Sequence, residues 1–214
     1  MNFANCKPTC RTPAALKIAA AMAACAMVWT GTSTAQETAP AMGPEQQAMM
    51  AAWQKAATPG PQHKQLADHF VGTWDTRQSM WMDHNAPPVI ETGKAVFTST
   101  LGGRQVRMDF NGSFMGQGFE GVGYSGYDNS GGKYTSSWMD NMSTAVMNSS
   151  GDYDAGTQTY TYVGQLPDMM KPGSTTTVRE TVRIVDADNF VMQMFEPHDG
   201  KEVRTMQIDY TRVK

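Results

Sequence analysis

The sequence has 214 residues, enough for one domain or two small ones. Seventeen Lys and Arg side chains against twenty Asp and Glu give a net charge of −3, but three of the bases and none of the acids fall in residues 1–35. The rest of the chain therefore carries a net charge of −6, which argues against binding to nucleic acid. All three cysteines also lie in residues 1–35, which excludes disulfides, thiol catalysis and Cys-based zinc sites beyond them.

Residues 1–35 have the pattern of a signal peptide. A basic stretch ends at Lys17, an apolar run extends from Ile18 to Trp29, and Ser33-Thr34-Ala35 supplies small residues for cleavage before Gln36. We therefore expect a mature protein that is periplasmic or secreted. Acylation at Cys25, in Met22-Ala-Ala-Cys25, is the alternative. No later segment has the roughly 20 apolar residues of a membrane span.

Residues 36–60 are rich in Ala, Gln, Met and Pro and are predicted to form a flexible segment. Within it, Pro44–Ala57 can form a short helix that Thr58-Pro-Gly-Pro61 stops. A second short helix is predicted from Gln62 to Phe70, because Leu66 and Phe70 are four residues apart and share one face.

From Trp74 onward the hydrophobic pattern has a period of two, which is typical of strands. The alternating runs cover 73–82, 91–101, 104–110, 118–126, 133–140, 144–150, 157–165, 174–185, 189–196 and 202–213. The connections are too short for crossover helices, so neighbouring strands should be antiparallel. Residues 61–214 are thus predicted to form one all-β domain, an antiparallel up-and-down barrel of about ten strands with the short N-terminal helix closing one end. A two-sheet sandwich is the alternative fold.

The alternation assigns charged residues to faces that are otherwise apolar. Arg104 aligns with Met108, Glu180 aligns with Val178 and Val182, and Arg204 aligns with Met206. Such faces would line a barrel wide enough to hold a small, partly apolar ligand. The predicted ligand-binding residues are Arg104, Met108, Tyr134, Trp138, Asp140, Glu180, Met194 and Arg204.

Glu180 requires a partner if it lies inside an apolar barrel, and Arg104 or Arg204 could supply one. These charges could anchor an acidic or hydroxylated ligand, or they could form an internal salt bridge that completes the core.

The ends of the predicted barrel resemble a known fold family. Gly72-Thr-Trp74 opens the first strand and Arg212 stands in the last, an arrangement similar to lipocalin-like (calycin) barrels, in which such a Trp packs under such an Arg. A cation–π contact of this kind contributes about 0.5–2 kcal/mol. Trp74 and Arg212 are therefore predicted to close one end.

A more specific resemblance covers nearly all of residues 61–214. Pro61-Gln-His-Lys-Gln-Leu66, Leu101-Gly-Gly-Arg104, Gly126-Tyr-Asp-Asn129 and Lys133-Tyr-Thr-Ser-Ser-Trp-Met-Asp140 are similar to the bacterial domain-of-unknown-function family numbered 1579. The resemblance implies the barrel and a bacterial origin, but no reaction.

Two other functions remain open. Glu180 or Asp140 could act as the base of an isomerase or hydrolase. Alternatively, methionines such as Met80, Met82, Met192 and Met194 could offer thioethers to Cu(I) in a periplasmic copper-handling protein, although methionines spaced by two in a strand also serve as core filler.

The sequence predicts no cofactor. His63, His69, His84 and His198 fall in the helix or in loops, so no axial haem ligand is expected inside the barrel. The expected partner is a small molecule, with nucleic acid and a membrane span in the mature chain excluded and a homodimer left open.

Overall fold

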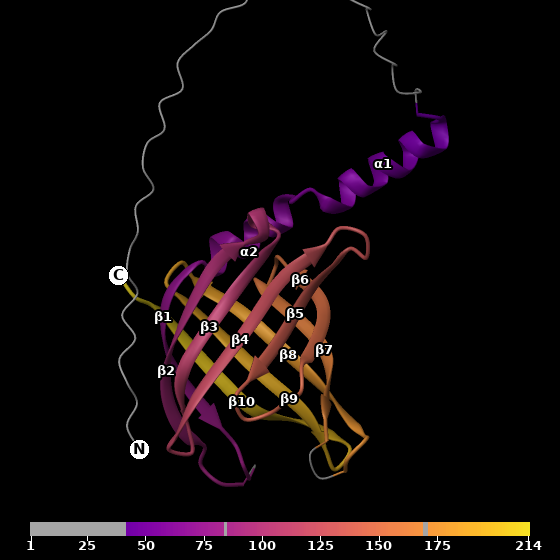
Figure 1. The fold of residues 1–214 in the computed structure, drawn as a ribbon. Coiled ribbons are helices and arrows are strands. Elements are labelled where there is room, and N and C mark those ends of the chain that lie inside the picture. The colour runs from indigo at the N-terminus through magenta and orange to yellow at the C-terminus, as the bar shows by residue number, and fades with distance from the viewer. Residues whose placement is uncertain (1–41, 84, 169–170) are drawn as a thin grey trace, which may run out of the picture. The chain divides into compact units, whose positions relative to one another are not determined.

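The computed structural model describes residues 42–83, 85–168 and 171–214. The predicted signal peptide, its alternative acylation site at Cys25, and His84 lie outside the described residues. Two helices precede ten strands and one short 3-10 turn (Figure 1). Their bounds are α1 Pro44–Ala57, α2 Pro61–Phe70, β1 Gly72–Met80, β2 Val89–Thr100, η1 Leu101–Gly103, β3 Gln105–Phe114, β4 Gln117–Asp128, β5 Lys133–Asp140, β6 Met147–Asp154, β7 Thr159–Pro167, β8 Thr175–Asp186, β9 Asn189–His198 and β10 Lys201–Arg212.

The ten strands form a closed barrel in which each strand is antiparallel to its sequence neighbours and β10 pairs with β1. The predicted all-β up-and-down barrel is therefore confirmed, and the sandwich alternative is wrong. Closure leaves no strand edge unpaired, which removes the aggregation risk that an open ten-stranded sheet would carry. The long consecutive hairpins of the barrel are visible in Figure 1.

The third strand is longer than predicted. Asn111-Gly112 is a favoured hairpin turn, but β3 continues through it to Phe114 and turns at Met115 and Gly116, which have φ of 50° and 74°. Gly112 lies opposite Gly93 in the register. A Cβ on Gly112 would come within 2.9 Å of the Phe110 ring, so this glycine makes room for an aromatic side chain rather than a turn.

Both helices begin in the same way, with a glycine followed by proline at the first helical position, where the missing N–H costs no hydrogen bond. The helix α1 coincides with the predicted Pro44–Ala57 segment and buries none of its residues. Its last carbonyls are held by the β4–β5 turn, because the Asn129 side-chain amide donates to the carbonyls of Lys55, Ala56 and Thr58 at 2.8–3.2 Å.

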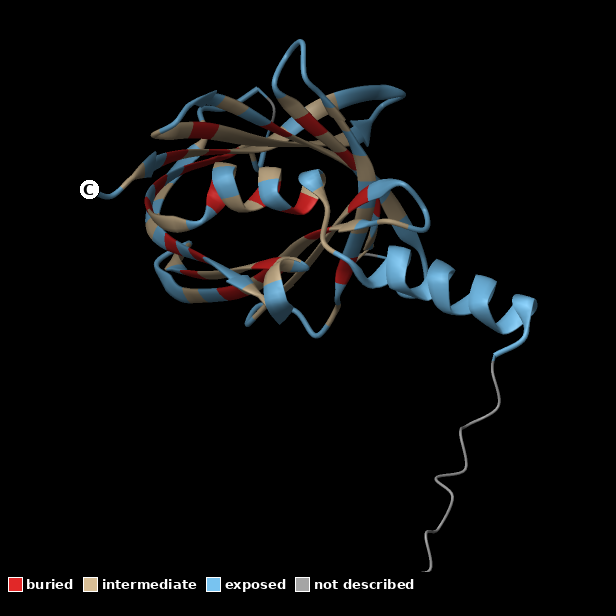
Figure 2. Cartoon of the chain, turned by 90° about the horizontal axis from the view of Figure 1, so that it is seen from above, coloured by how far each residue is buried: buried red, intermediate tan, exposed pale blue. Residues whose placement is uncertain are grey.

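The helix α2 closes one end of the barrel, as predicted. Figure 2 shows it lying across the barrel opening, and His63, Leu66 and Phe70 are buried. Phe70 packs against Phe97, Tyr160 and Phe190, with ring centroids 5.1–5.9 Å apart. The hydrophobic core thus gathers beneath α2, and the opposite end, formed by the β1–β2, β3–β4, β5–β6, β7–β8 and β9–β10 connections, is called the open end below.

Candidate functional site

Arg212 and Trp74 fasten α2 to the barrel wall. The Arg212 guanidinium carbon lies 4.0 Å from the centroid of the Trp74 ring. Its Nη1 donates to Val71 O at 2.7 Å and its Nη2 to His69 O at 3.3 Å, while the Trp74 indole donates to Phe70 O at 2.7 Å. The last carbonyls of a helix have no partners within it, so these donors satisfy them.

Gly72 completes this closure. Its φ is +140°, and a Cβ there would stand 2.4 Å from Arg212 Nη1. The glycine of the G-x-W pattern is therefore required both by its backbone conformation and by the space that the guanidinium occupies.

Strand register assigns side chains to the interior, because directly opposed residues of neighbouring strands share a face of the sheet. The buried Trp74 marks the inner face of β1, which continues through Thr76, Gln78 and Met80. Following the pairs around the barrel from Met80 gives one level of inward residues across five strands: Met80, Met206, Met194, Glu180 and Tyr162.

The barrel interior differs between its two halves. Near α2 the inward residues Tyr160, Phe190 and Tyr210 are buried. From the middle of the barrel to the open end, the inward side chains Trp138, Glu180, Met194 and Met206 are partly exposed, whereas Met80, Met147 and Val178 are buried. Because a residue facing the inside of a closed barrel has no access to outer solvent through the wall, this exposure indicates space inside the barrel beside these side chains.

Glu180 lies at the boundary between the two halves. Burial raises the pKa of its carboxyl from 4.5 to about 7. The carboxyl has no hydrogen bond or ion pair with any residue that the structure describes. It is close enough to the hydroxyls of Tyr162 and Tyr210 to raise their pKa values, which desolvation already holds above the ordinary range.

Two further polar groups of the inner face of β1 lack partners among the described residues. They are the Oγ1 of Thr76 and the Nε2 of Gln78, and each residue is only 4% exposed. A buried donor without an acceptor costs about 1–3 kcal/mol. Such a cost at two neighbouring inward positions, on the same inner face as the Glu180 carboxyl, is characteristic of a site that a ligand completes.

Trp138 forms part of the wall on the opposite side of the barrel. Its ring lies flat against β4, where a Cβ on Gly121 would stand 2.2 Å from the ring, and it stacks on Phe119 with centroids 6.2 Å apart. Its indole donates to Asp140 Oδ2 at 2.8 Å, and Asp140 Oδ1 accepts from the backbone amides of Met142 and Ser143. Asp140 thus orients the Trp138 ring and ends the strand at the open end.

Six of the eight predicted ligand-binding residues face inward: Met108, Tyr134, Trp138, Asp140, Glu180 and Met194. Tyr134 belongs to the packed half, where it is 6% exposed and its hydroxyl donates to Gln65 Oε1 of α2 at 3.1 Å. Met108 lies in the half of β3 nearer α2, Glu180 and Met194 lie midway along β8 and β9, and Trp138 and Asp140 lie towards the open end.

The predicted inward positions of Arg104 and Arg204 are wrong. Arg104 lies in the turn after η1, exposed, where its Nη1 donates to Leu101 O at 3.0 Å. In β10 a bulge between Arg204 and Met206 inserts one residue and reverses the faces, so Arg204 points outward. There it stacks on Trp81, 4.3 Å from the ring centroid, and donates to Gln207. Neither arginine supplies the partner expected for Glu180.

Gln78, Thr76, Tyr162 and Tyr210 were not singled out from the sequence. The period-two pattern of β1 and β7 carries the signal that could have found them, since Gln78 and Thr76 alternate with outward residues in phase with Trp74. Glu196, which accepts from the Thr205 hydroxyl at 3.0 Å, and Glu91, which accepts from Ser113, were also missed.

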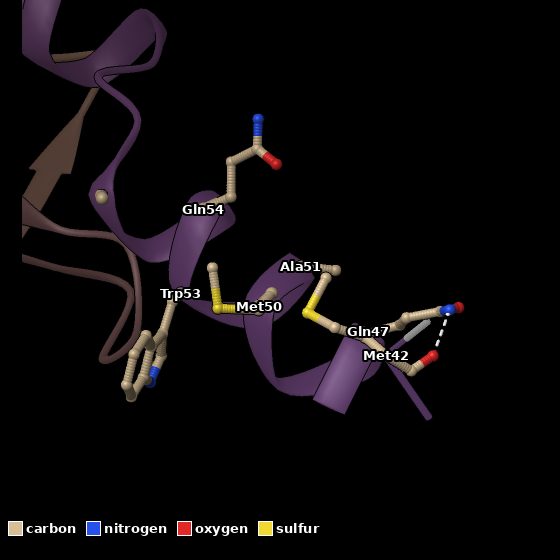
Figure 3. Close-up of a pocket in the computed structure, with 7 residues that line it drawn as sticks. Met42, Gln47, Met50, Ala51, Trp53 and Gln54 are labelled. Carbon is tan, nitrogen blue, oxygen red and sulfur yellow. Dashed lines mark hydrogen bonds between the residues drawn. The ribbon is translucent and has the colours of Figure 1, made fainter. Parts of the chain in front are cut away.

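A second apolar surface lies on α1. Met42, Met50 and Trp53 are 46–63% exposed there, and Gln47 donates to Met42 O at 2.7 Å (Figure 3). Residues of this one helical segment line it, so it offers an exposed face rather than an enclosed site.

Within the described ranges, no helix is long and apolar enough to cross a membrane. Among the same residues, no three His, Cys, Asp or Glu side chains come together in a way that could hold a metal ion.

The ten consecutive antiparallel strands and the helix across one end define a closed up-and-down β-barrel protein. The chain belongs to the DUF1579 family of proteins of unknown function, whose family model matches residues 58–212. No curated protein matches the sequence.

Solved structures support the fold. The crystal structure of Rv2717c from M. tuberculosis is similar with a TM-score of 0.54 and 13% identity, over 73% of this chain and all of that one. The S-type phycobiliprotein lyase CPES from Guillardia theta has a TM-score of 0.47 and 12% identity, over 71% of this chain and 92% of that one. At these identities the likeness to Rv2717c concerns the fold alone, and the lower score of the lyase supports no conclusion about this chain.

Proposed function

We propose that this protein binds a small, partly apolar molecule inside its barrel, through the open end. The observation that carries the proposal is the Glu180 carboxyl, which has no partner among the described residues and lies among partly exposed inward side chains. Thioether and aromatic surfaces would supply affinity, and the few polar groups would orient the guest. The open end itself carries exposed apolar side chains, including Met82, Met115, Met142 and Val146, which suits an apolar guest.

Native mass spectrometry of the protein purified from its own host tests the proposal directly, because a co-purified guest adds its mass to that of the chain. A titration with the neutral dye N-phenyl-1-naphthylamine gives an independent measurement. We expect saturable fluorescence enhancement that Met194→Trp weakens at least tenfold by filling the interior. The matched variant Gln193→Trp, on the outward side of the same strand, should bind as the unchanged chain does. Equal binding by both variants would place the dye elsewhere.

The same proposal includes export. A signal peptide that ends at Ala35 would place the binding protein in the periplasm or outside the cell. The mass of the protein recovered from the periplasmic fraction should correspond to a chain beginning at Gln36. A full-length chain in the cytosol would contradict export without affecting the binding proposal, and a lipid-modified Cys25 would support the lipoprotein alternative.

A copper-handling function is supported by one observation. The register places Met80, Met206 and Met194 at one level on three adjacent strands, and thioethers are ligands that Cu(I) prefers. Titration with Cu(I) under reducing conditions separates this function from binding of an organic guest. Submicromolar affinity that Met206→Leu abolishes would support copper, and weak binding unaffected by that change would exclude this site.

Catalysis by Glu180 is the other candidate function, since a carboxyl with a pKa of about 7 suits general-base work near neutral pH. A broad screen for isomerase and hydrolase turnover tests it. Activity that Glu180→Gln abolishes while dye binding persists would favour an enzyme over a carrier.

A further inference from the structure

The inner face of the barrel carries an uneven charge. Four strand carboxyl groups point inward by register: Glu91, Asp140, Glu180 and Glu196. Glu180 lies midway along β8, and the other three lie towards the open end, near the start of β2 and the ends of β5 and β9. A molecule that enters the barrel by the open end therefore meets carboxyl groups first and reaches Glu180 last.

Cations are nearly absent from the same face. Among the described strand residues, only Arg212 and Lys201 share the inward register. Arg212 is engaged at the closed end with Trp74 and the carbonyls of α2, and Lys201 is exposed at the tip of the β9–β10 hairpin. The remaining strand cations point outward: Arg77, Lys94, Arg107, Lys133, Arg179, Arg183 and Arg204.

Four of these seven outward cations form ion pairs. Lys94 pairs with Asp75, Arg107 with Asp109, Lys133 with Asp152, and Arg179 with Glu202, all on the outer surface. The chain thus neutralises carboxylates outside the barrel and leaves those inside without a basic side chain. An unpaired buried carboxylate is destabilising, so a positively charged ligand that binds beside it would stabilise the folded chain.

We propose, as a refinement that rests on the proposed function, that the guest is an organic amine: a cationic ammonium group on an apolar body, with its charge placed at Glu180. The walls suit such a molecule better than a hydrated metal ion, because Met194 and Tyr162 flank Glu180 in the register and the aromatic residues Trp138 and Phe119 lie on the inner face. Aromatic faces attract cations, and thioethers pack against apolar chains.

A polar group of the inner face points to a ligand independently of the charges. Gln78 is 4% exposed, faces the interior, and its Nε2 has no acceptor among the described residues. An amine that also carries a hydroxyl, ether or carbonyl oxygen would satisfy this donor. The guest is therefore a cation with an acceptor oxygen rather than a simple hydrocarbon, and an acid is disfavoured by the carboxyl groups that it would meet.

Three probes that differ only in the head group test the proposal: 1-octylamine, 1-octanol and octanoate. Isothermal titration calorimetry of the full chain at pH 8 measures the three affinities. We expect octylamine to bind at least tenfold more tightly than octanol, and octanoate to bind more weakly than octanol. This comparison uses the unchanged protein, so it stands even if a variant fails to fold.

The variant Glu180→Gln removes the proposed partner with little change in shape. It should lower octylamine affinity at least tenfold and leave octanol affinity within twofold. The matched control is Glu120→Gln, which makes the same chemical change on an exposed residue of β4 and should alter neither affinity.

Octylamine remains cationic between pH 5.5 and 8.5, so any change in its binding there reports on the protein. Binding should strengthen as Glu180 ionises on rising through pH 7, and Glu180→Gln should flatten the profile. The titratable groups that interact with Glu180 are Tyr162 and Tyr210, whose raised pKa values keep them neutral. The carboxyl groups of Glu91, Asp140 and Glu196 lie further towards the open end. His69 belongs to α2, contacts Tyr160 at the closed end, and has a pKa that burial lowers.

The outcomes distinguish this proposal from the proposed function. If octanol and octylamine bind equally and Glu180→Gln changes neither, the barrel binds apolar guests but the guest is not an amine. If octanoate binds most tightly, the charge assignment is wrong. If none of the probes and no neutral dye binds, both proposals fail together.

Discussion

Burial of the Glu180 carboxyl lowers the stability of the folded chain when the carboxyl is ionised. Its carboxyl has no partner among the described residues, and burial raises its pKa to about 7. The folded chain therefore keeps a proton on Glu180 between pH 4.5 and about 7, where the unfolded chain has lost it. Stability contributed by this proton is present at low pH and is lost as the pH rises towards 7.

We expect Glu180→Gln to stabilise the protein at pH 8 and to leave its stability nearly unchanged at pH 4.5. The difference in free energy of unfolding should be about 3 kcal/mol at pH 8, since the pKa rises from 4.5 to about 7 on folding and each pKa unit corresponds to about 1.4 kcal/mol. Urea unfolding at both pH values measures it. The unchanged chain and the variant share all other titrating groups. If the variant gained the same free energy of unfolding at pH 4.5 and at pH 8, the gain would not come from ionisation of Glu180.

At the scale of the element, glycines of β4 shape the wall against which Trp138 lies. Gly121 is opposite Asp140 in the register, and a Cβ there would come 2.2 Å from the Trp138 ring. Gly118 is on the same strand, but a Cβ there would meet no atom within 4 Å. The two positions thus separate the effect of losing a glycine from the effect of displacing the ring.

Gly121→Ala should destabilise the protein by about 1–3 kcal/mol, the usual cost of overpacking, and should move Trp138 away from Asp140. Gly118→Ala should change the free energy of unfolding by less than about 0.5 kcal/mol. Thermal unfolding together with the near-UV circular dichroism of the aromatic rings measures both effects. If the two variants behave alike, the ring does not lie against Gly121 as the structure has it.

At the scale of the whole molecule, the two helices contribute very differently to stability. The helix α1 buries no residue, and its described hydrogen bonds to the barrel come from the single side chain of Asn129. The helix α2 buries Leu66 and Phe70 in the core, each worth about 1.5–3 kcal/mol, and supplies carbonyl acceptors to Trp74 and Arg212. It is therefore an integral part of the barrel.

Three chains that begin at Met42, Thr58 and Val71 test this difference. We expect the first two to unfold at temperatures within a few degrees of each other, because only α1 separates them. The chain from Val71 lacks α2 and should lose cooperative unfolding, since it exposes the core beneath the helix. A large loss on removing α1 alone would instead show that this helix has a structural role in the barrel.

Much of this protein could be read from its sequence, because strands and their faces follow a local period. The alternation from Trp74 onward, with connections too short for helices, determined the all-β barrel, and Leu66 with Phe70 determined the buried face of the closing helix. The same alternation assigned Glu180, Met194 and Trp138 to the inner face. These features depend on residues near one another in the chain.

Only the tertiary structure decided where the charges lie. The bulge between Arg204 and Met206 adds one residue to β10 and turns Arg204 outward. The period-two alternation of the sequence does not predict this bulge. The turn after η1 removes Arg104 from its strand. The absence of both arginines from the inner face, and the position of Gln78 and Glu180 on that same face, depend on strand register over the whole closed sheet. The sequence alone therefore determined the barrel, whereas its closed register decided that the interior is acidic.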